Sequence, residues 1–341
     1  MIWGLGMLTD KFPRAVLAHT PTPIEKLLNL SDELGGPEIW IKRDDCTGLA
    51  FGGNKARQLE YYIGEAINQS ADTILITSAV QSNYLRSAVA AARKYGMDVE
   101  VQLEERVPDR PNEYYHSGNP YLMRLMGAKL HRYPVGEDEE GADNAMFERA
   151  ENLKKTGKRP YVVPLAGHHT PIGALGYVDC AEELLTQIKE KDIDFDLIIT
   201  ASGSGTTHTG LLAGLRAMGS NIPVYGICVR RDRSAQFERV FSKTKRVARM
   251  IGWDGEISAN DVKLTDATLA PGYGQLNAEV REAIDMAARL EGLLVDPVYT
   301  GKALAGLIHL IRKGEVANNK RLLFIHTGGT PALFGYPELV E

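Results

Sequence analysis

The chain has 341 residues, of which 44% are hydrophobic and 24% are charged, a composition typical of a globular enzyme and unlike that of a disordered or fibrous protein. Its formal net charge of −5 offers no basic surface for nucleic acid or for an anionic membrane, so we expect partners to be small molecules or a second copy of the chain. Because the length exceeds what one hydrophobic core usually supports, we expect two domains or one large domain carrying an insertion.

The N-terminal segment and the cysteines give no sign of export. Residues 1–8 are apolar, but they lack a basic region and end at Thr9-Asp10-Lys11, which makes them too short for a signal peptide or a membrane span. The three cysteines lie far apart and form no C-x-x-C pair, so they predict neither a disulfide framework nor a metal site. We therefore expect a cytoplasmic protein with reduced thiols and no membrane contact.

Short β-branched runs alternate with longer helical patterns along the whole chain. Buried strands are expected at residues 73–77, 99–103, 161–163, 197–200, 224–229 and 322–326. Such alternation favours parallel sheets with covering helices. A helix is expected just after Lys55, from the i, i+3, i+4, i+7 spacing of Leu59, Tyr62, Ile63, Ala66 and Ile67.

Domain borders are only weakly marked, since no repeat, low-complexity tract or clear linker interrupts the chain. We expect a small domain at residues 56–163 and a large domain formed by residues 1–55 and 164–341. Ligands of such sheets bind beyond the carboxyl ends of the strands, where loops meet helix starts, so motifs at these junctions carry the most information.

The first motif is Gly52-Gly53-Asn54-Lys55, placed where a helix is expected to begin. The glycines allow a tight turn and a close approach to a planar ligand, and the helix dipole disfavours a charged ammonium at that end. An uncharged lysine amine is what Schiff-base chemistry requires. The same four residues also fit a simple turn that carries an exposed lysine.

The second motif runs from Ala201 through Gly203, Ser204, Gly205 and Thr206, directly after an expected strand. Small and hydroxyl residues there expose backbone N–H groups at a helix start, which predicts a phosphate site. It is neither a P-loop nor a complete dinucleotide fingerprint, since His208 stands where a third glycine belongs. A plain helix-capping loop is the alternative.

Three further segments follow expected strands. Ser82 and Asn83 are either helix caps or ligands for a ring hydroxyl or a carboxylate. Tyr299 is a candidate for ring stacking or proton transfer, Thr327 for donation to a ring nitrogen, and Tyr273 lies in a glycine-rich loop. Tyr273, Tyr299 and Thr327 are equally compatible with a structural role, the tyrosines in packing and the threonine in a turn.

Taken together and in this order, the motifs resemble the D-cysteine desulfhydrase and 1-aminocyclopropane-1-carboxylate deaminase family, within the tryptophan synthase β-like group of pyridoxal phosphate enzymes. The resemblance extends from Thr20-Pro21-Thr22-Pro23 to Gly335-Tyr336. It implies the α/β architecture of fold type II, with two open, twisted, mostly parallel sheets and covering helices. It also implies pyridoxal 5′-phosphate as cofactor, a small amino acid as substrate and a homodimer.

The resemblance implies a role for each candidate residue. Lys55 would bind the cofactor covalently and act as a base, with Ser82, Tyr273 and Tyr299 as the other catalytic residues. The cofactor would be held by Lys55, Asn54, Asn83, Ala201, Gly203, Ser204, Gly205, Thr206 and Thr327. The substrate would be bound by Ser82, Asn83, Tyr84, His168, His169 and Thr300.

Some residues depart from the family pattern. Cyclopropane deaminases usually carry a glutamate after the Pro-Val-Tyr tyrosine and a leucine before the late Gly-Gly pair, where this chain has Thr300 and Thr327. A threonine permits a neutral pyridine ring, which suits a good β-leaving group better than ring opening. Gln58 stands where relatives commonly have a lysine, and Tyr84 replaces the usual histidine.

Four functions follow from these observations. D-cysteine desulfhydrase chemistry is preferred. The adjacent His168 and His169 leave an L-cysteate sulfo-lyase open, and 1-aminocyclopropane-1-carboxylate deaminase is a further alternative. A non-catalytic protein that binds pyridoxal phosphate or an amino acid is the alternative of another class. A nucleotide-dependent dehydrogenase would share the sheet class but lacks support in the glycine motif.

Overall fold

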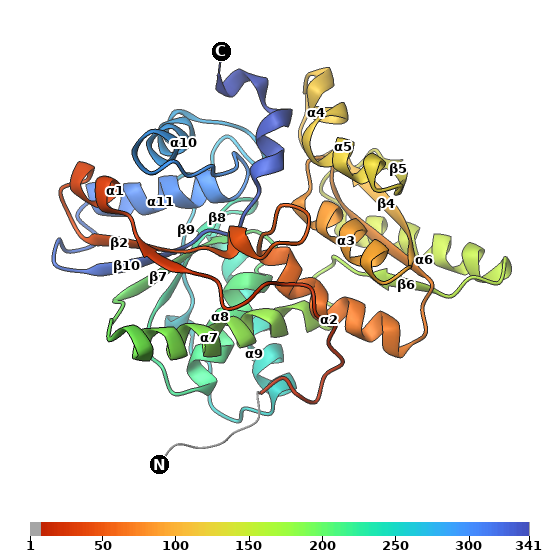
Figure 1. Cartoon of the computed structure of the whole chain (residues 1–341), viewed down its shortest axis with the longest axis horizontal. Helices are drawn as coiled ribbons and strands as arrows, with labels where there is room; N and C mark the ends of the chain where they lie inside the picture. Colours follow the sequence, from red (N-terminus) through yellow and green to blue (C-terminus); the bar gives the residue numbers. More distant parts are fainter. Residues whose placement is uncertain (1–7, 341) are drawn as a thin grey trace.

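A six-stranded sheet forms the larger part of the computed structural model, which describes residues 8–340 (Figure 1). Residues 1–7, part of the apolar segment expected to be too short for a signal peptide or a membrane span, lie outside this range. The sheet is parallel except for its first strand, which pairs antiparallel with the second. In spatial order its strands are β1 (Ile24–Lys26), β2 (Glu38–Lys42), β10 (Arg321–Ile325), β7 (Leu197–Ser202), β8 (Val224–Cys228) and β9 (Lys263–Thr265).

A second sheet has four strands, all parallel, and is formed by one continuous part of the chain. Its strands, in spatial order, are β5 (Lys129–Tyr133), β4 (Asp98–Glu104), β3 (Thr73–Ala79) and β6 (Pro160–Val163). All four lie within the small domain expected at residues 56–163, although the exact borders stay a prediction.

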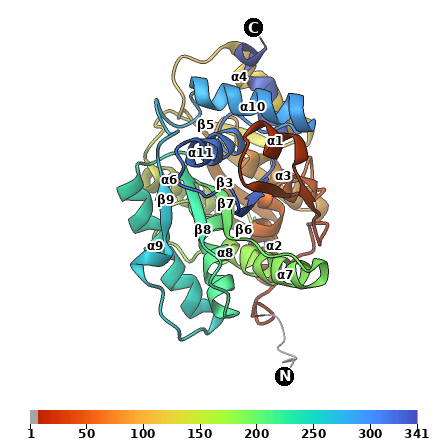
Figure 2. The same ribbon diagram turned by 90° about the vertical axis from the view of Figure 1, so that its left-hand side faces the viewer.

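Helices cover both faces of each sheet. They are α1 (Leu28–Glu33), α2 (Asn54–Asn68), α3 (Asn83–Lys94), α4 (Asn112–His116), α5 (Gly118–Leu125), α6 (Glu139–Lys155), α7 (Leu175–Lys191), α8 (Thr206–Ala217), α9 (Arg233–Ile251), α10 (Ala278–Glu291) and α11 (Thr300–Arg312). The turned view shows α11 and α8 on opposite sides of β7 and β8 (Figure 2). Among residues 8–340, no helix is long and apolar enough to cross a membrane.

The alternation of side chains along the strands explains this layering. Ile199 and Phe324 pack with α10 and α11, whereas their neighbours Ile198 and Leu323 pack with α7 and α8. Strands that are buried on both faces read as continuous apolar runs, which is why the sequence marked them clearly. In the four-stranded sheet, Ile74 and Ile76 pack against α2 and α3, while Leu75 faces α6.

The six expected strands are confirmed as β3, β4, β6, β7, β8 and β10, with ends that shift by one or two residues. The helix after Lys55 is confirmed as α2, and Lys55 lies in its first turn. This helix is more deeply buried than an amphipathic pattern indicates, since every residue from Ala56 to Gly64 is buried. Its burial fixes Lys55 relative to both sheets.

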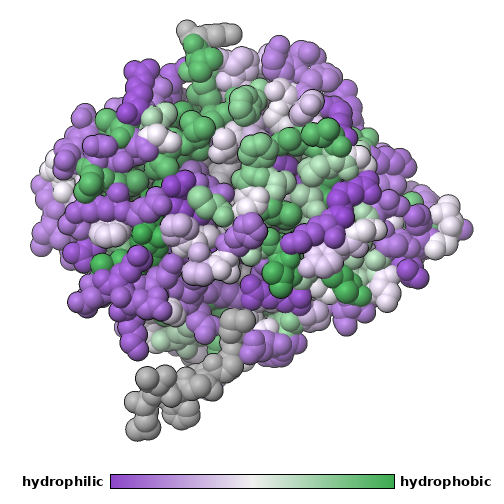
Figure 3. All heavy atoms as spheres, in the orientation of Figure 1, coloured by the Kyte–Doolittle hydropathy of each residue, from purple (hydrophilic) through white to green (hydrophobic). Residues whose placement is uncertain are grey.

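The face of the molecule drawn in Figure 3 is mostly hydrophilic, with apolar residues more frequent in one part of it than elsewhere. Figure 3 shows them in the upper part of the viewed face, near the C-terminal segment and α4 and α5. Tyr121 and Phe334 are 57% and 67% exposed and line a shallow groove there. The pocket described next lies elsewhere and shares no residue with this groove.

Candidate active site

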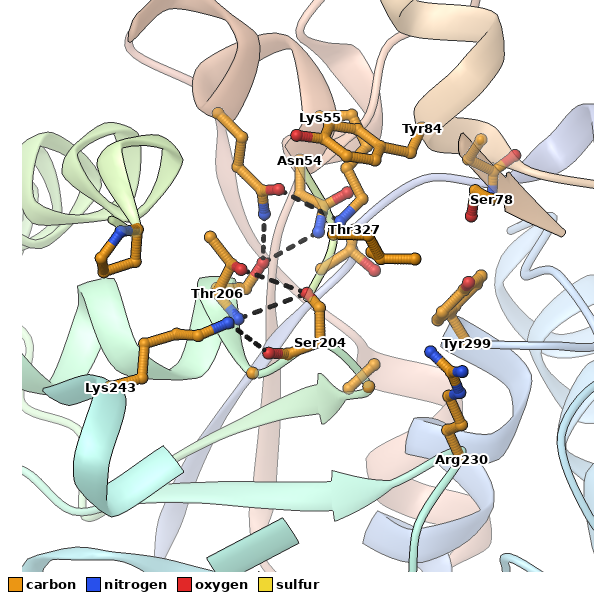
Figure 4. A pocket seen from close by; sticks show the side chains of 18 of the residues that line it. Asn54, Lys55, Ser78, Tyr84, Ser204, Thr206, Arg230, Lys243, Tyr299 and Thr327 are labelled. Carbon is orange, nitrogen blue, oxygen red and sulfur yellow. Dashed lines mark hydrogen bonds between the residues drawn. The ribbon is translucent and has the colours of Figure 1, made fainter. Parts of the chain in front are cut away.

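One pocket collects the polar residues that follow the strands of both sheets (Figure 4). The four-stranded sheet and the segments after it supply Ser78, Asn83, Tyr84, Arg106 and residues 164–166 and 169–171. The six-stranded sheet and its loops supply Ala201, residues 203–207, Arg230, Tyr273, Tyr299 and Thr327, and the helices add Asn54, Lys55, Gln58, Tyr62 and Lys243. This is the position expected for a ligand site in an open α/β protein.

The turn before Lys55 depends on its two glycines. Gly52 and Gly53 have φ of +62° and +110°, a region that side chains disfavour. A Cβ on Gly53 would lie 2.9 Å from the carbonyl oxygen of Thr327, and the N–H of Asn54 donates to that same oxygen over 3.1 Å. The turn therefore brings two segments from opposite ends of the chain into contact beside Lys55.

The amine of Lys55 lies at the pocket wall, and no acidic residue within residues 8–340 pairs with it. Its Nζ donates to Oε1 of Gln58 over 3.2 Å and lies 5.1 Å from the centroid of the Tyr84 ring. Burial lowers the pKa of Lys55 to about 8. At neutral pH a useful fraction of this amine is therefore uncharged and able to attack a carbonyl carbon.

The loop at residues 203–207 turns directly into α8. Gly205 has φ of +80°, and a Cβ on Gly203 would approach Val229 to 3.1 Å and Tyr299 to 3.5 Å. The first N–H groups of α8 have no acceptor within the helix, and that of Thr206 makes only a long bond of 3.4 Å to Oγ of Ser204, so this helix start can bind an anion. Thr207, which was absent from the prediction, accepts from Nδ2 of Asn54 over 2.9 Å and ties the loop to α2.

We call Lys55 and residues 203–207 the loop end of the pocket. Its functional groups are an amine of lowered pKa and a helix start that is open to an anion. The arrangement fits a ligand that carries an aldehyde at one position and a phosphate at another.

A second part of the lining, which meets the loop end where the Tyr299 ring lies beside Gly203, contains two tyrosines in direct contact. The hydroxyl groups of Tyr273 and Tyr299 are 2.6 Å apart. Burial raises the pKa of both phenols above the usual value, so both are protonated at neutral pH and able to donate a proton. Asp296 fixes Tyr299 by accepting from its backbone N–H over 3.0 Å.

Two arginines lie beside the tyrosines, and both are held by glutamates. Arg106 donates to Glu104 over 2.7 Å, and its guanidinium lies 5.7 Å from the centroid of the Tyr273 ring. Arg230 contacts Glu139 over 2.6 Å and also pairs with Glu137 over 2.8 Å. We call Tyr273, Tyr299, Arg106 and Arg230 the tyrosine end.

The loop at residues 164–171 forms another wall. Asp143 accepts from the N–H groups of Leu165 and Ala166, and its carboxylate lies 3.3 Å from Nε2 of His169. Burial and the neighbouring His168 lower the pKa of His169, which favours its neutral form. His169 lines the pocket, whereas the side chain of His168 is 61% exposed and lies outside the lining.

The structure brings most of the predicted site residues to this pocket. Those that line it are Lys55, Asn54, Asn83, Tyr84, His169, Ala201, Gly203, Ser204, Gly205, Thr206, Tyr273, Tyr299 and Thr327. Ser82, Thr300 and His168 are not among the lining residues. Their predicted roles, like those of the lining residues, stay predictions.

Local hydrogen bonds explain the positions of Ser82 and Thr300. Ser82 is 1% exposed and its Oγ accepts from the N–H groups of Tyr84 and Leu85 at the start of α3. Thr300 is fully buried, and its hydroxyl donates to Oδ1 of Asp296 over 2.7 Å at the start of α11. The Ser82 hydroxyl thus caps α3, as the capping alternative predicted. At α11 the N–H groups are satisfied by the carboxylate of Asp296, which the Thr300 hydroxyl helps to hold in place.

Several lining residues were missing from the predicted site. They are Gln58, Tyr62, Ser78, Arg106, Pro164, Leu165, Ala166, Thr170, Pro171, Thr207, Arg230 and Lys243. The added cations change the electrostatics of the pocket, because no Asp or Glu occurs among the described residues that line it. The site therefore favours anionic ligands.

Comparison with known proteins identifies relatives over nearly the whole chain. The model of the family "Pyridoxal-phosphate dependent enzyme" matches residues 16–328. A 1-aminocyclopropane-1-carboxylate deaminase of Methylobacterium nodulans is 39% identical over 331 residues, covering 96% of this chain and 98% of the relative. A D-cysteine desulfhydrase of Serratia proteamaculans is 40% identical over 326 residues, covering 96% of each chain.

Solved structures give the same architecture. A crystal structure of an ACC deaminase homologue superposes with a TM-score of 0.87 at 38% identity, covering 98% of this chain and 97% of the other. O-ureido-L-serine synthase, at 16% identity and a TM-score of 0.66, shares the fold. The expected fold of two mostly parallel sheets is confirmed.

Proposed function

The chain belongs to the pyridoxal-phosphate dependent enzyme family, and from this premise we propose that it is a lyase that acts on a small β-substituted amino acid, as D-cysteine desulfhydrases do. With water, D-cysteine would give pyruvate, ammonia and sulfide. The observation that carries the proposal is that an amine of lowered pKa and a pair of protonated tyrosines line one pocket whose described lining has no acidic residue.

The residues present fit pyridoxal 5′-phosphate. Residues 203–207 would hold its phosphate at the start of α8, and Lys55 would bind its aldehyde. Asn83 and Thr327 line the pocket and would contact the 3′-oxygen and the ring nitrogen. When bound, the cofactor supplies a conjugated ring that accepts the electron pair of the broken Cα–H bond.

Lys55 would act twice. Its uncharged amine would hold the cofactor, and once released by the amino group of the substrate it would be free to act at Cα. The freed amine removes the proton from Cα as a general base. The lowered pKa of Lys55 supports both steps, because each requires the uncharged form at neutral pH.

The tyrosine pair would protonate the leaving group. Tyr273 and Tyr299 share a short hydrogen bond, so one hydroxyl can donate to the departing sulfur while the other stabilises the oxygen left behind. Burial keeps both phenols protonated before the step. Loss of the β-substituent leaves an unsaturated amino acid, which water converts to pyruvate and ammonia.

Thr327 supports β-elimination over the opening of a cyclopropane ring. A threonine hydroxyl beside a pyridine nitrogen permits a neutral ring, whereas a carboxylate would keep the nitrogen protonated. No described lining residue is acidic. A weaker electron acceptor is sufficient for a good β-leaving group, so a sulfur substituent is favoured.

Arg106 and Arg230 support a second candidate substrate, L-cysteate. Both guanidinium groups line the tyrosine end, where the β-substituent would leave, and Arg106 has no bonded partner for its Nη1 among the described residues. A sulfonate is a permanent anion that arginines bind well. With water, L-cysteate would give pyruvate, ammonia and sulfite.

A substrate panel tests the proposal. Purified enzyme with cofactor is offered D-cysteine, L-cysteate, D-serine or 1-aminocyclopropane-1-carboxylate, and pyruvate, 2-oxobutanoate, ammonia, sulfide and sulfite are measured. We expect pyruvate with sulfide or sulfite. Faster formation of 2-oxobutanoate from the cyclopropane acid would identify a deaminase, and no product from any substrate would favour the non-catalytic binding protein. The homodimer and the cytoplasmic location stay predictions.

A further inference from the structure

Lys243 directs a buried amine at the loop end of the pocket from a helix distant in sequence. It lies on α9 between Val240 and Val247, on the face of the helix that packs inward, and it is only 6% exposed. Its Nζ donates to the carbonyl oxygen of Ser204 over 2.7 Å. Figure 4 shows the side chain extended toward Ser204 and Thr206 at the pocket wall.

In the part of the chain that the structure describes, this amine has no carboxylate partner. Within residues 8–340, no Asp or Glu lies within ion-pair distance of Lys243, whereas the fully buried Lys42 pairs with Glu183. Burial of a charged group without a counter-charge is unfavourable, and this is reflected in a pKa of Lys243 well below the usual value. The bond to one carbonyl does not compensate for that loss.

The surrounding charges make the imbalance larger. Arg239 donates to the same carbonyl of Ser204 over 3.1 Å, and Arg231 donates to the carbonyl of Gly203 over 3.2 Å. Glu139 is the one carboxylate among the described residues that contacts either arginine, and Arg230 shares it. Positive charge therefore exceeds negative charge where the loop meets α9.

We propose that Lys243 is a phosphate-binding residue, whose ammonium group compensates the charge of the cofactor phosphate held at residues 203–207. A phosphate dianion would supply the missing counter-charge, and hydrogen bonds between charged groups are stronger than those to a neutral carbonyl. The N–H groups at the start of α8 would bind the same group. The assignment concerns the cofactor alone, so it holds whichever amino acid is the substrate.

A purely structural role is the alternative, in which Lys243 only fixes the loop through Ser204. The two roles differ in the protein without cofactor. If Lys243 is purely structural, it stabilises the loop whether or not phosphate is present. If Lys243 binds phosphate, its buried amine lacks a counter-charge in the apoprotein. The stability of the apoprotein and the affinity for the phosphate group therefore separate them.

The experiment compares Lys243→Met with Lys245→Met, a control on the same helix whose lysine is exposed. The affinities of the apoprotein for pyridoxal 5′-phosphate and for pyridoxal are measured by absorbance titration without substrate. In Lys243→Met, affinity for the phosphorylated compound should fall about 10- to 100-fold, the range of a hydrogen bond between charged groups, while affinity for pyridoxal stays the same. Lys245→Met should change neither.

Thermal melting gives the second readout. Apoprotein carrying Lys243→Met should melt at the same or a higher temperature than the unchanged apoprotein, and pyridoxal 5′-phosphate should raise its melting temperature by less. Equal losses of affinity for both compounds, or a lower melting temperature of the apoprotein, would overturn the proposal. So would failure of both Lys243→Met and Lys243→Gln to fold while Lys245→Met folds. A negative result would leave the substrate proposal untouched, because no substrate is used.

Discussion

The two ends of the pocket differ in whether their basic side chains are paired with carboxylates. At the loop end, Lys55 contacts Gln58 and Lys243 contacts a backbone carbonyl, and neither has an acidic partner among the described residues. At the tyrosine end, Arg106 and Arg230 are each paired with glutamates. The lysines are therefore available to bind and react, while the arginines are held in position by their glutamates and present only their remaining N–H groups to a ligand.

The largest expected effect comes from the loop end. Lys55→Ala removes both the group that holds the cofactor covalently and the base at Cα, so kcat should fall by about 10⁴-fold or more. The visible absorbance of the bound cofactor should disappear with it. Steady-state rates and a spectrum of the purified variant check this, with Lys245→Met as control. Turnover close to that of the unchanged enzyme would remove Lys55 from the mechanism.

At the tyrosine end, Tyr299→Phe should lower kcat by about 10²- to 10³-fold because it removes a proton donor for the leaving group. The loss should be larger for D-cysteine than for L-cysteate, since sulfite leaves without a proton more readily than sulfide. Tyr273→Phe should act in the same direction. Rates measured with both substrates test the order, and equal losses for the two would argue against protonation of the leaving group.

Substitution of a paired arginine at the tyrosine end should lower the stability of the protein, whereas substitution of Lys243, which has no carboxylate partner within residues 8–340, should not. The side chains of Arg106 and Glu104 are 3% and 0% exposed, so Arg106→Met leaves a buried carboxylate unpaired. Removing one member of such a pair costs about 3–5 kcal/mol of the free energy of unfolding, and adding Glu104→Gln should recover much of it. Denaturant unfolding measures both, and Arg132→Met, at an exposed site, is the control. No recovery in the double variant would contradict the pairing.

The smallest expected effect is on the pH dependence of the reaction between Lys55 and an aldehyde. Because burial lowers the pKa of Lys55 to about 8, the uncharged fraction of its amine rises as pH rises through that value. The rate at which apoprotein reacts with pyridoxal should therefore increase about tenfold from pH 7 and level off above pH 9. Stopped-flow absorbance follows this reaction. A rate that keeps rising to pH 10.5 would mean that the amine is not perturbed.

Sequence patterns predicted the fold and the loop end well, because both depend on residues that are adjacent in the sequence. The buried strands are short apolar runs, and Lys55 and residues 203–206 lie in contiguous motifs whose glycines and hydroxyls have direct backbone consequences. The strands β1, β2, β5 and β9 were not predicted. β1 and β9 have three residues each, and the residues of β5 are exposed or only partly buried, so their patterns are weak.

The tyrosine end was harder to predict because its cations come from separate segments. Arg106 and Arg230 follow β4 and β8 and reach the pocket only through tertiary packing. The position of Lys243 is unusual in the sequence itself, since a lysine stands between Val240 and Val247 on the apolar face of α9, where charged residues are rare. His168 was predicted to bind substrate because it is adjacent to His169. Only the side chain of His169 lines the pocket, since adjacent side chains need not point the same way.

The central claim is that Lys55 is the residue to which the cofactor is attached. Borohydride reduction of the enzyme with bound pyridoxal 5′-phosphate makes such an attachment permanent, and mass spectrometry of its peptides then locates the label. The account predicts a single phosphopyridoxyl group on the peptide at Lys55. A label on Lys243 or another lysine instead, or no label on a protein that binds the cofactor, would contradict it.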